Sequence, residues 1–197
     1  TTTIGEQKLP TVDTHFRIAS VTKTMTSATT LLLAQDGRLR LDDPVSKYVP
    51  QVPNGANITI AQLLEMRSGL YSFTDSDTIV NSLDNTPTRA WTPQELLDIA
   101  FAHPPNFAPG ADYEYSNTNF VILGKVLEKA AGRPLEDLIR EGILDPLSLR
   151  DTRSEQTAII QEPVLHAFDA ERGKYEESTY WDPSWTLAHG AIMTSNI

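Results

Sequence analysis

Ser20 and Lys23 lie three residues apart in the stretch from Phe16 to Gly37, and together the two side chains could carry out nucleophilic chemistry. Residues at positions i and i+3 share one face of an α-helix, so the hydroxyl and the amine would point the same way. The amino end of a helix disfavours a cation, which would help the amine to accept the hydroxyl proton. The alternative is a helix-capping serine followed by a solvated lysine, and the spacing alone leaves both interpretations open.

Tyr115 and Asn117 form the sole Tyr-x-Asn sequence of the chain and complement that pair. A phenol beside a lysine ammonium can pass a proton to a leaving group, and an asparagine amide can donate to a substrate carbonyl while it accepts elsewhere. The alternative is that Tyr115 is a half-buried loop aromatic and that Asn117 caps the next helix. We predict that all four side chains converge, with the Ser20 hydroxyl near both the Lys23 amine and the Tyr115 hydroxyl.

Two helices must position these residues. The first is predicted from Ser20 to Gly37, because apolar residues recur at steps of three and four before a glycine that favours a left-handed helix end. Its predicted apolar face consists of Val21, Met25, Ala28 and Leu32. The second is predicted from about Thr118 to Ala131, and its predicted apolar face consists of Phe120, Leu123, Leu127 and Ala130.

Helix caps and turns punctuate the rest of the chain. Capping-box spacing at 59–62 and 92–95 predicts helices that end at Gly69 and near Ala102, and Pro134 begins another that reaches about Glu141. We expect a short extended segment at 16–18, one helical turn within 39–50 and a long surface loop over 70–89. Residues 191–197 end on helix-capping types with no helix after them.

Composition excludes several classes of function. The formal net charge is −10 and no basic cluster stands out, which argues against nucleic acid or an anionic membrane surface as a partner. The absence of cysteine removes disulfides, thiolate catalysis and cysteine-ligated metals. No apolar run reaches membrane-spanning length and no signal peptide opens the chain. Hydrophobic residues make up 40% of the sequence, which is enough for a core.

Several blocks of the sequence resemble the penicillin-recognising serine hydrolases, above all class C type β-lactamases and soluble D-alanyl-D-alanine carboxypeptidases of actinobacterial type. The blocks are 15–27 with Ser20-Val-Thr-Lys23, 35–50, 58–71 with a Ser-Gly-Leu turn, and 109–124 with Tyr115-Ser-Asn117. The resemblance runs from about residue 8 to 197. It implies an α+β fold, β-lactamase/transpeptidase-like, in which a helical domain packs on an antiparallel sheet with the active site between them. It implies neither a metal nor an organic cofactor.

The resemblance also implies a role for each candidate residue. Ser20 would be the acylated nucleophile, Lys23 its proton partner and Tyr115 the acid/base for the leaving group. Asn117 would bind the acyl-side amide of a small-molecule or peptide substrate. The implied activity is that of a D-alanyl-D-alanine carboxypeptidase with penicillins as covalent inhibitors. A β-lactamase or a carboxylesterase would use the same chemistry, and a non-catalytic binding protein on the same fold is the alternative from another class.

The chain departs from the family pattern at the third motif, which is Lys or His followed by Thr or Ser and then Gly. No such triplet follows Asn117, and His189-Gly190-Ala191 lacks the hydroxyl residue. The first two strands, the closing strands and the last helix of the family also lack a counterpart. We therefore expect residues 1–197 to form an incomplete domain whose sheet is completed by a second polypeptide or by a further segment. From the resemblance alone we expect a secreted, periplasmic or cell-envelope location.

Overall fold

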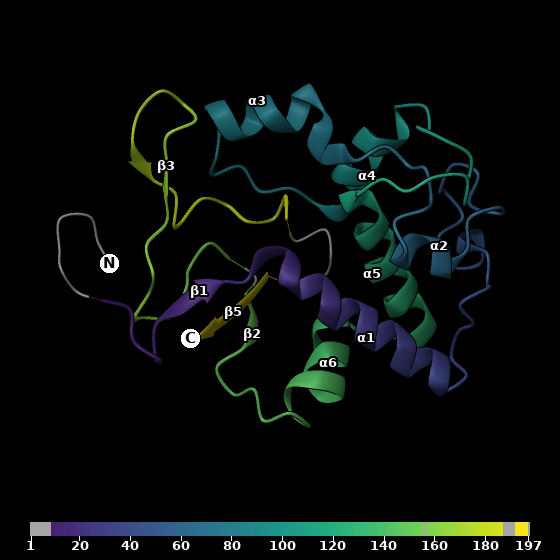
Figure 1. The fold of residues 1–197 in the computed structure, drawn as a ribbon, viewed down its shortest axis with the longest axis horizontal. Helices are drawn as coiled ribbons and strands as arrows, with labels where there is room; N and C mark the ends of the chain where they lie inside the picture. Colours follow the sequence, from purple (N-terminus) through teal and green to yellow (C-terminus); the bar gives the residue numbers. More distant parts are fainter. Residues whose placement is uncertain (1–8, 156, 187–191, 197) are drawn as a thin grey trace.

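The computed structural model describes residues 9–155, 157–186 and 192–196, and it divides them into a helical part and a small sheet (Figure 1). Helix α1 (Thr22–Gln35) begins beside the sheet and runs across α5 (Asn117–Ala131) and α6 (Leu135–Ile139). Helices α2 (Ile60–Leu64), α3 (Asp77–Asn85) and α4 (Pro93–Phe101) surround the far side of α5. The amino end of α1 therefore lies at the junction between the two parts.

The sheet is antiparallel and has the order β1-β5-β2, with strands β1 (His15–Arg17), β5 (Ile192–Asn196) and β2 (Arg153–Glu155). Residue 15 pairs with 196, and residue 153 pairs with 194. The extended segment expected at 16–18 is confirmed one residue earlier. The interpretation of the last residues as helix-capping types was wrong for 192–196, because ladders on both sides hold their backbone in a strand. A separate hairpin joins β3 (Phe168–Asp169) to β4 (Glu176–Glu177).

Helix α1 spans the predicted residues but buries a different face from the predicted one. Val21 and Leu32 are 59% and 37% exposed, whereas Thr26, Thr30 and Leu33 are buried. The Thr30 hydroxyl donates to the Thr26 carbonyl at 2.8 Å, within the helix itself. A buried threonine whose hydroxyl is satisfied in this way packs through its methyl group like a small apolar residue. The sequence pattern missed this face because threonine counts as polar.

Helix α5 is the centre of the core, and it is more deeply buried than a one-sided pattern predicts. Phe120, Leu123 and Leu127 are buried as expected, but so are Val121 and Ile122 on other sides of the helix. Helices α1, α2, α4 and α6 all contact α5, so little of its surface faces solvent. The predicted end is confirmed, since Gly132 has a left-handed conformation with φ of 70°.

The predicted helix caps are confirmed, with shorter helices in two cases. Thr59 and Thr92 each form a complete capping box, at α2 and α4 respectively. Helix α2 ends at Leu64 rather than at Gly69, and α6 gives way after Ile139 to the π-helical segment η4 (Arg140–Leu144). The helical turn expected within 39–50 is the 3-10 segment η2 (Val45–Lys47).

The long loop predicted over 70–89 was wrong, because this stretch contains the 3-10 segment η3 (Phe73–Asp75) and helix α3. The Ser76 side chain caps α3 by accepting from the Ile79 N–H at 3.3 Å. Ile79 is 1% exposed, and Leu83 packs against the same core. Two apolar anchors in a short polar stretch are too weak a signal for periodicity, and packing against the core stabilises the helix instead.

Candidate active site

Ser20 lies in the 3-10 turn η1 (Ala19–Val21), which joins β1 to α1. Ala19 has a φ of 45°, a left-handed conformation that costs a non-glycine residue about 1–2 kcal/mol. This turn redirects the chain from strand to helix and leaves Ser20 exposed at the amino end of α1. Strained residues of this kind persist where the surrounding structure holds them, and they concentrate at functional sites.

Lys23 is 7% exposed, so the interpretation of this residue as a solvated lysine was wrong. Its Nζ lies 3.0 Å from Ser20 Oγ and 2.9 Å from Asn117 Oδ1. The rings of Tyr115 and Phe120 flank the same nitrogen, with centroids at 5.1 and 5.6 Å. The amine is thus enclosed by one hydroxyl, one amide oxygen and two aromatic faces.

Tyr115 is the fourth side chain that meets at this site, because its hydroxyl lies 2.9 Å from Ser20 Oγ. The ring is 45% exposed and stands in the extended segment before α5. The preceding residue fixes that segment, since the Glu114 N–H donates to the Met66 carbonyl at 3.0 Å. The predicted convergence of the four side chains is confirmed, and their catalytic roles stay a prediction.

Asn117 is the first residue of α5, yet its side chain does not cap that helix. The amide oxygen accepts from Lys23, and Nδ2 donates to Thr74 Oγ1 at 3.1 Å. The backbone N–H of Asn117 donates to Ser72 Oγ at 3.2 Å. The interpretation of Asn117 as a helix cap was therefore wrong, and the amide is held between Lys23 of α1 and Thr74 of η3.

Thr74 is the residue of this site that sequence reasoning missed. It lies in η3, within the stretch predicted as a loop, and no pattern in that stretch singles it out. The next residue of α5 fixes η3 in place, because the Thr118 hydroxyl donates to the Tyr71 carbonyl at 2.7 Å. The same hydroxyl accepts from the Phe73 N–H at 3.1 Å. The position of Thr74 is therefore set by contacts that are distant in sequence.

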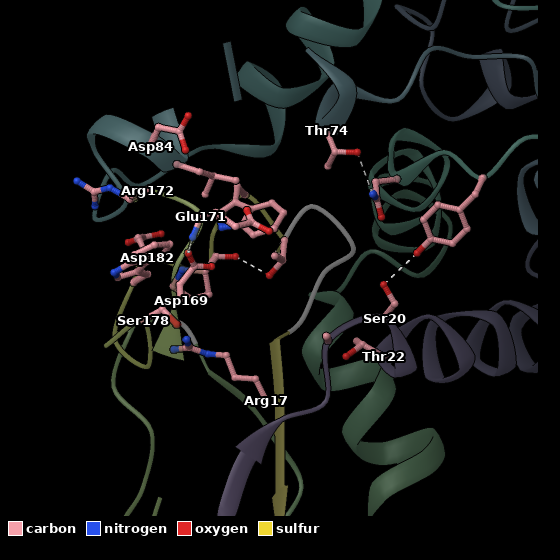
Figure 2. Close-up of a pocket in the computed structure, with 18 residues that line it drawn as sticks. Arg17, Ser20, Thr22, Thr74, Asp84, Asp169, Glu171, Arg172, Ser178 and Asp182 are labelled. Atoms are coloured by element: carbon pink, nitrogen blue, oxygen red, sulfur yellow. Dashed lines mark hydrogen bonds between the residues drawn. The ribbon is translucent and has the colours of Figure 1, made fainter. Parts of the chain in front are cut away.

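A cavity of about 530 Å³ opens beside Ser20. One wall carries the group just described, with Thr74, Tyr115 and Asn117. The opposite wall comes from α3, the β3–β4 hairpin and residues 181–186 (Figure 2). The apolar members of this wall are Leu83, Trp181, Pro183 and Trp185, and its carboxylates are Asp84, Asp169, Glu171 and Asp182. A substrate bound at Ser20 would extend toward an aromatic and acidic surface.

Three further expectations concern the surroundings of this site. His189, which was compared above with the first residue of the third motif, lies outside the described residues. Within the described ranges, no group of three or more His, Cys, Asp or Glu residues is arranged to hold a metal ion. Among the helices of the described part of the chain, none is long and apolar enough to span a membrane.

Comparison with known proteins places the chain in a well-populated family. A family model described as Beta-lactamase matches residues 2–196. The D-alanyl-D-alanine-carboxypeptidase/endopeptidase AmpH of Escherichia coli (strain K12) is 35% identical to this chain over 153 residues. The alignment covers 75% of this chain and 39% of AmpH.

Two solved structures are similar over nearly the whole chain. A D-stereospecific amidohydrolase from Streptomyces sp. has a TM-score of 0.87 and 37% identity, and the match covers 93% of this chain and 58% of that one. The D-amino acid amidase from Ochrobactrum anthropi SV3 in complex with L-phenylalanine has a TM-score of 0.80 and 31% identity, with coverage of 96% and 54%. The predicted fold class is confirmed, and the chain spans little more than half the length of these structures.

Proposed function

The chain belongs to the beta-lactamase family, and from this premise we propose that it is a serine hydrolase that forms an acyl-enzyme at Ser20. The observation that carries the proposal is the position of Lys23 Nζ, within hydrogen-bond distance of both Ser20 Oγ and Asn117 Oδ1. An unassisted serine hydroxyl is a poor nucleophile, and a neighbouring base is the common way to activate it. Here the hydroxyl and an amide for the substrate line one cavity, and the base contacts both of them.

In the proposed first step, Ser20 Oγ bonds to the carbonyl carbon of the substrate while Lys23 takes up the hydroxyl proton. The Asn117 amide binds the acyl side of the substrate through Nδ2. The Ser20 backbone N–H, at the amino end of α1, is available to the developing oxyanion.

In the second step, the bond between the carbonyl carbon and the leaving nitrogen breaks, and that nitrogen receives a proton from Tyr115. The Lys23 ammonium returns the proton that it took from Ser20 to Tyr115, and the 2.9 Å contact between the two hydroxyls places the phenol beside the bond that breaks. Water then attacks the ester at Ser20, which releases the acid and restores the hydroxyl.

For the substrate, we propose a peptide that ends in D-alanyl-D-alanine, with penicillins as covalent inhibitors. The name of the AmpH relative supports this class. A second candidate is the amide of a D-amino acid, which the names of the two similar structures support. The cavity is lined by four carboxylates against the two guanidinium groups of Arg17 and Arg172, and this excess of negative charge favours the second class, because it would attract the free ammonium group of an amino acid amide.

Two further parts of the proposal concern the setting of the enzyme. The third motif would come from a second polypeptide or from a further segment. It would add a second hydrogen-bond donor to the oxyanion site, beside the Ser20 backbone N–H. The cell envelope is the proposed location, since D-alanyl-D-alanine peptides belong there.

Labelling of the purified protein with a fluorescent penicillin, followed by release kinetics, tests the reaction class. A stable adduct at Ser20 supports a carboxypeptidase, and rapid release indicates a β-lactamase. The absence of an adduct in wild-type protein contradicts the penicillin-binding part and leaves a D-amino acid amidase, an esterase or a non-catalytic binding protein. Parallel assays with an acetylated lysyl-D-alanyl-D-alanine peptide and with D-phenylalanine amide separate the two substrate classes, with the L-isomers as controls.

A further inference from the structure

We propose that Thr74 is a positioning residue that fixes the orientation of the Asn117 amide. The inference rests on the proposed function, because the orientation matters only if Asn117 binds substrate. Thr74 Oγ1 accepts from Asn117 Nδ2 at 3.1 Å and lies on the wall of the cavity that contains Ser20 (Figure 2).

The hydrogen bonds around Thr74 leave its hydroxyl one way to interact with Asn117. A hydroxyl has one proton to donate and two lone pairs with which to accept. The Thr74 proton is directed at the Asp75 carboxylate, at 3.4 Å. Ser72 Oγ lies 2.8 Å from Thr74 Oγ1 and itself accepts from the Asn117 backbone N–H. Ser72 Oγ is a second acceptor within reach of the Thr74 proton, so that proton is shared between Asp75 and Ser72, and in either case a lone pair of Thr74 accepts from Nδ2.

Lys23 imposes the same orientation from the opposite side. Its amine donates to Asn117 Oδ1 at 2.9 Å, which requires the amide oxygen to face α1. A flipped amide would place its NH₂ group against the Lys23 amine, donor against donor, and would present its oxygen to a hydroxyl that has no proton left to donate. Two contacts from separate elements, α1 and η3, thus select one state of the amide.

The consequence is a donor held ready for the substrate. One hydrogen of Asn117 Nδ2 is bonded to Thr74, and the geometry leaves the second for a carbonyl group in the cavity. Catalytic constellations lose rate steeply when a binding group is misplaced or free to rotate. Thr74 touches the substrate-binding amide and not the reacting atoms, so its effect on the reaction passes through Asn117.

The test compares acylation rates with a fluorescent penicillin in wild type, Thr74→Val and Thr74→Ser. Valine keeps the shape and removes the hydroxyl, and we expect it to slow acylation about tenfold, the effect of losing one well-placed hydrogen bond. Serine restores the hydroxyl, and we expect a rate within about twofold of wild type. Thr24→Val is the matched control, because Thr24 does not line the cavity and its hydroxyl donates to the Val21 carbonyl.

A second comparison separates positioning from a general loss of structure. In an Asn117→Ala background, Thr74→Val should cost no further rate, because the amide that Thr74 orients is gone. An equal loss in both backgrounds, or a Thr74→Ser variant as slow as Thr74→Val, would overturn the inference. A wild-type protein that is never acylated would contradict the proposed function instead, so the two failures are distinguishable.

Discussion

The hydroxyls of Ser20 and Tyr115 lie 2.9 Å apart, although 95 positions separate the two residues in the chain. Ser20 is presented by the turn before α1, and Tyr115 by the segment before α5. The packing of α1 on α5 brings the two helix starts together. The proposed mechanism needs both side chains at one substrate, so it depends on this packing.

Ser20→Ala should abolish covalent labelling by a penicillin and leave the fold intact. The hydroxyl forms the proposed ester, while alanine is well tolerated at the start of a helix. Intact-mass spectrometry after incubation with the penicillin measures the adduct, and circular dichroism measures the fold. Ser178→Ala, on the opposite wall of the cavity, is the control and should label like wild type. An adduct on the Ser20→Ala protein would show that another residue is the nucleophile.

Lys23→Met should slow acylation by at least roughly a hundredfold, which is the lower end of the contribution of a positioned general base. Methionine replaces the buried stem of Lys23 without leaving a buried charge, so we expect a folded protein. Stopped-flow acylation with excess penicillin provides the rate. Lys129→Met, an exposed position in the last turn of α5, is the matched control. Equal rates for the two variants would remove Lys23 from the mechanism.

Tyr115→Phe should slow turnover by roughly a hundredfold or more, because the hydroxyl that carries the proton is lost. The ring remains over Lys23, and the side chain is about half exposed, so the melting temperature should stay close to that of wild type. Tyr113→Phe is the matched control, two residues earlier and 60% exposed. The assay follows hydrolysis of D-phenylalanine amide and of a D-alanyl-D-alanine peptide. A Tyr115→Phe enzyme with wild-type rates on both substrates would contradict the assigned role.

Gly69→Ala should destabilise the fold by about 3 kcal/mol or more, since it combines a strained backbone with a clash. Gly69 has a φ of 76°, and a Cβ there would clash with the Phe107 carbonyl oxygen. Gly37→Ala is the matched control, because its φ is 71° but a Cβ would meet no atom within 4 Å. We expect the control to lose only about 1 kcal/mol. Urea unfolding measures the loss of stability in both variants. Equal losses would show that the backbone at Phe107 shifts to accommodate the added Cβ at little cost.

Asp43 should make the stability of the fold depend on pH in the acid range. Hydrogen bonds from Lys47 and then from Tyr48 lower the pKa of this carboxyl from 3.8 to about 2. Because the folded pKa lies below the unfolded value, the stabilisation is complete above about pH 4 and is lost as the pH falls through about 2. Its size is roughly 2 kcal/mol, at about 1.4 kcal/mol for each unit of pKa.

Asp43→Asn tests this dependence by removing the charge. The variant should be less stable than wild type near neutral pH, and the difference should shrink as the pH falls through the range given above. Urea unfolding at several pH values measures the difference, with the exposed Asp36→Asn as control. A difference that stays constant down to about pH 2 would contradict the lowered pKa.

The helix ends could be predicted from the sequence because their causes are local. The capping boxes at Thr59 and Thr92 and the helix end at Gly132 depend on residues within one turn. Helix α3 could not be predicted in the same way, since Ile79 and Leu83 are its only anchors to the core. The buried face of α1 was missed because threonine satisfies its hydroxyl on its own helix.

By itself, the sequence determined which residues could react, because Ser20 and Lys23 share a helix face and Tyr115 and Asn117 share one short segment. Tertiary structure alone decided that the two pairs meet, that the Asn117 side chain bonds Lys23 rather than its own helix, and that Thr74 joins them. Residue spacing determines direction within a helix, but the distance between two helices depends on packing across the whole core. That packing is a property of many weak contacts together, and no single motif encodes it.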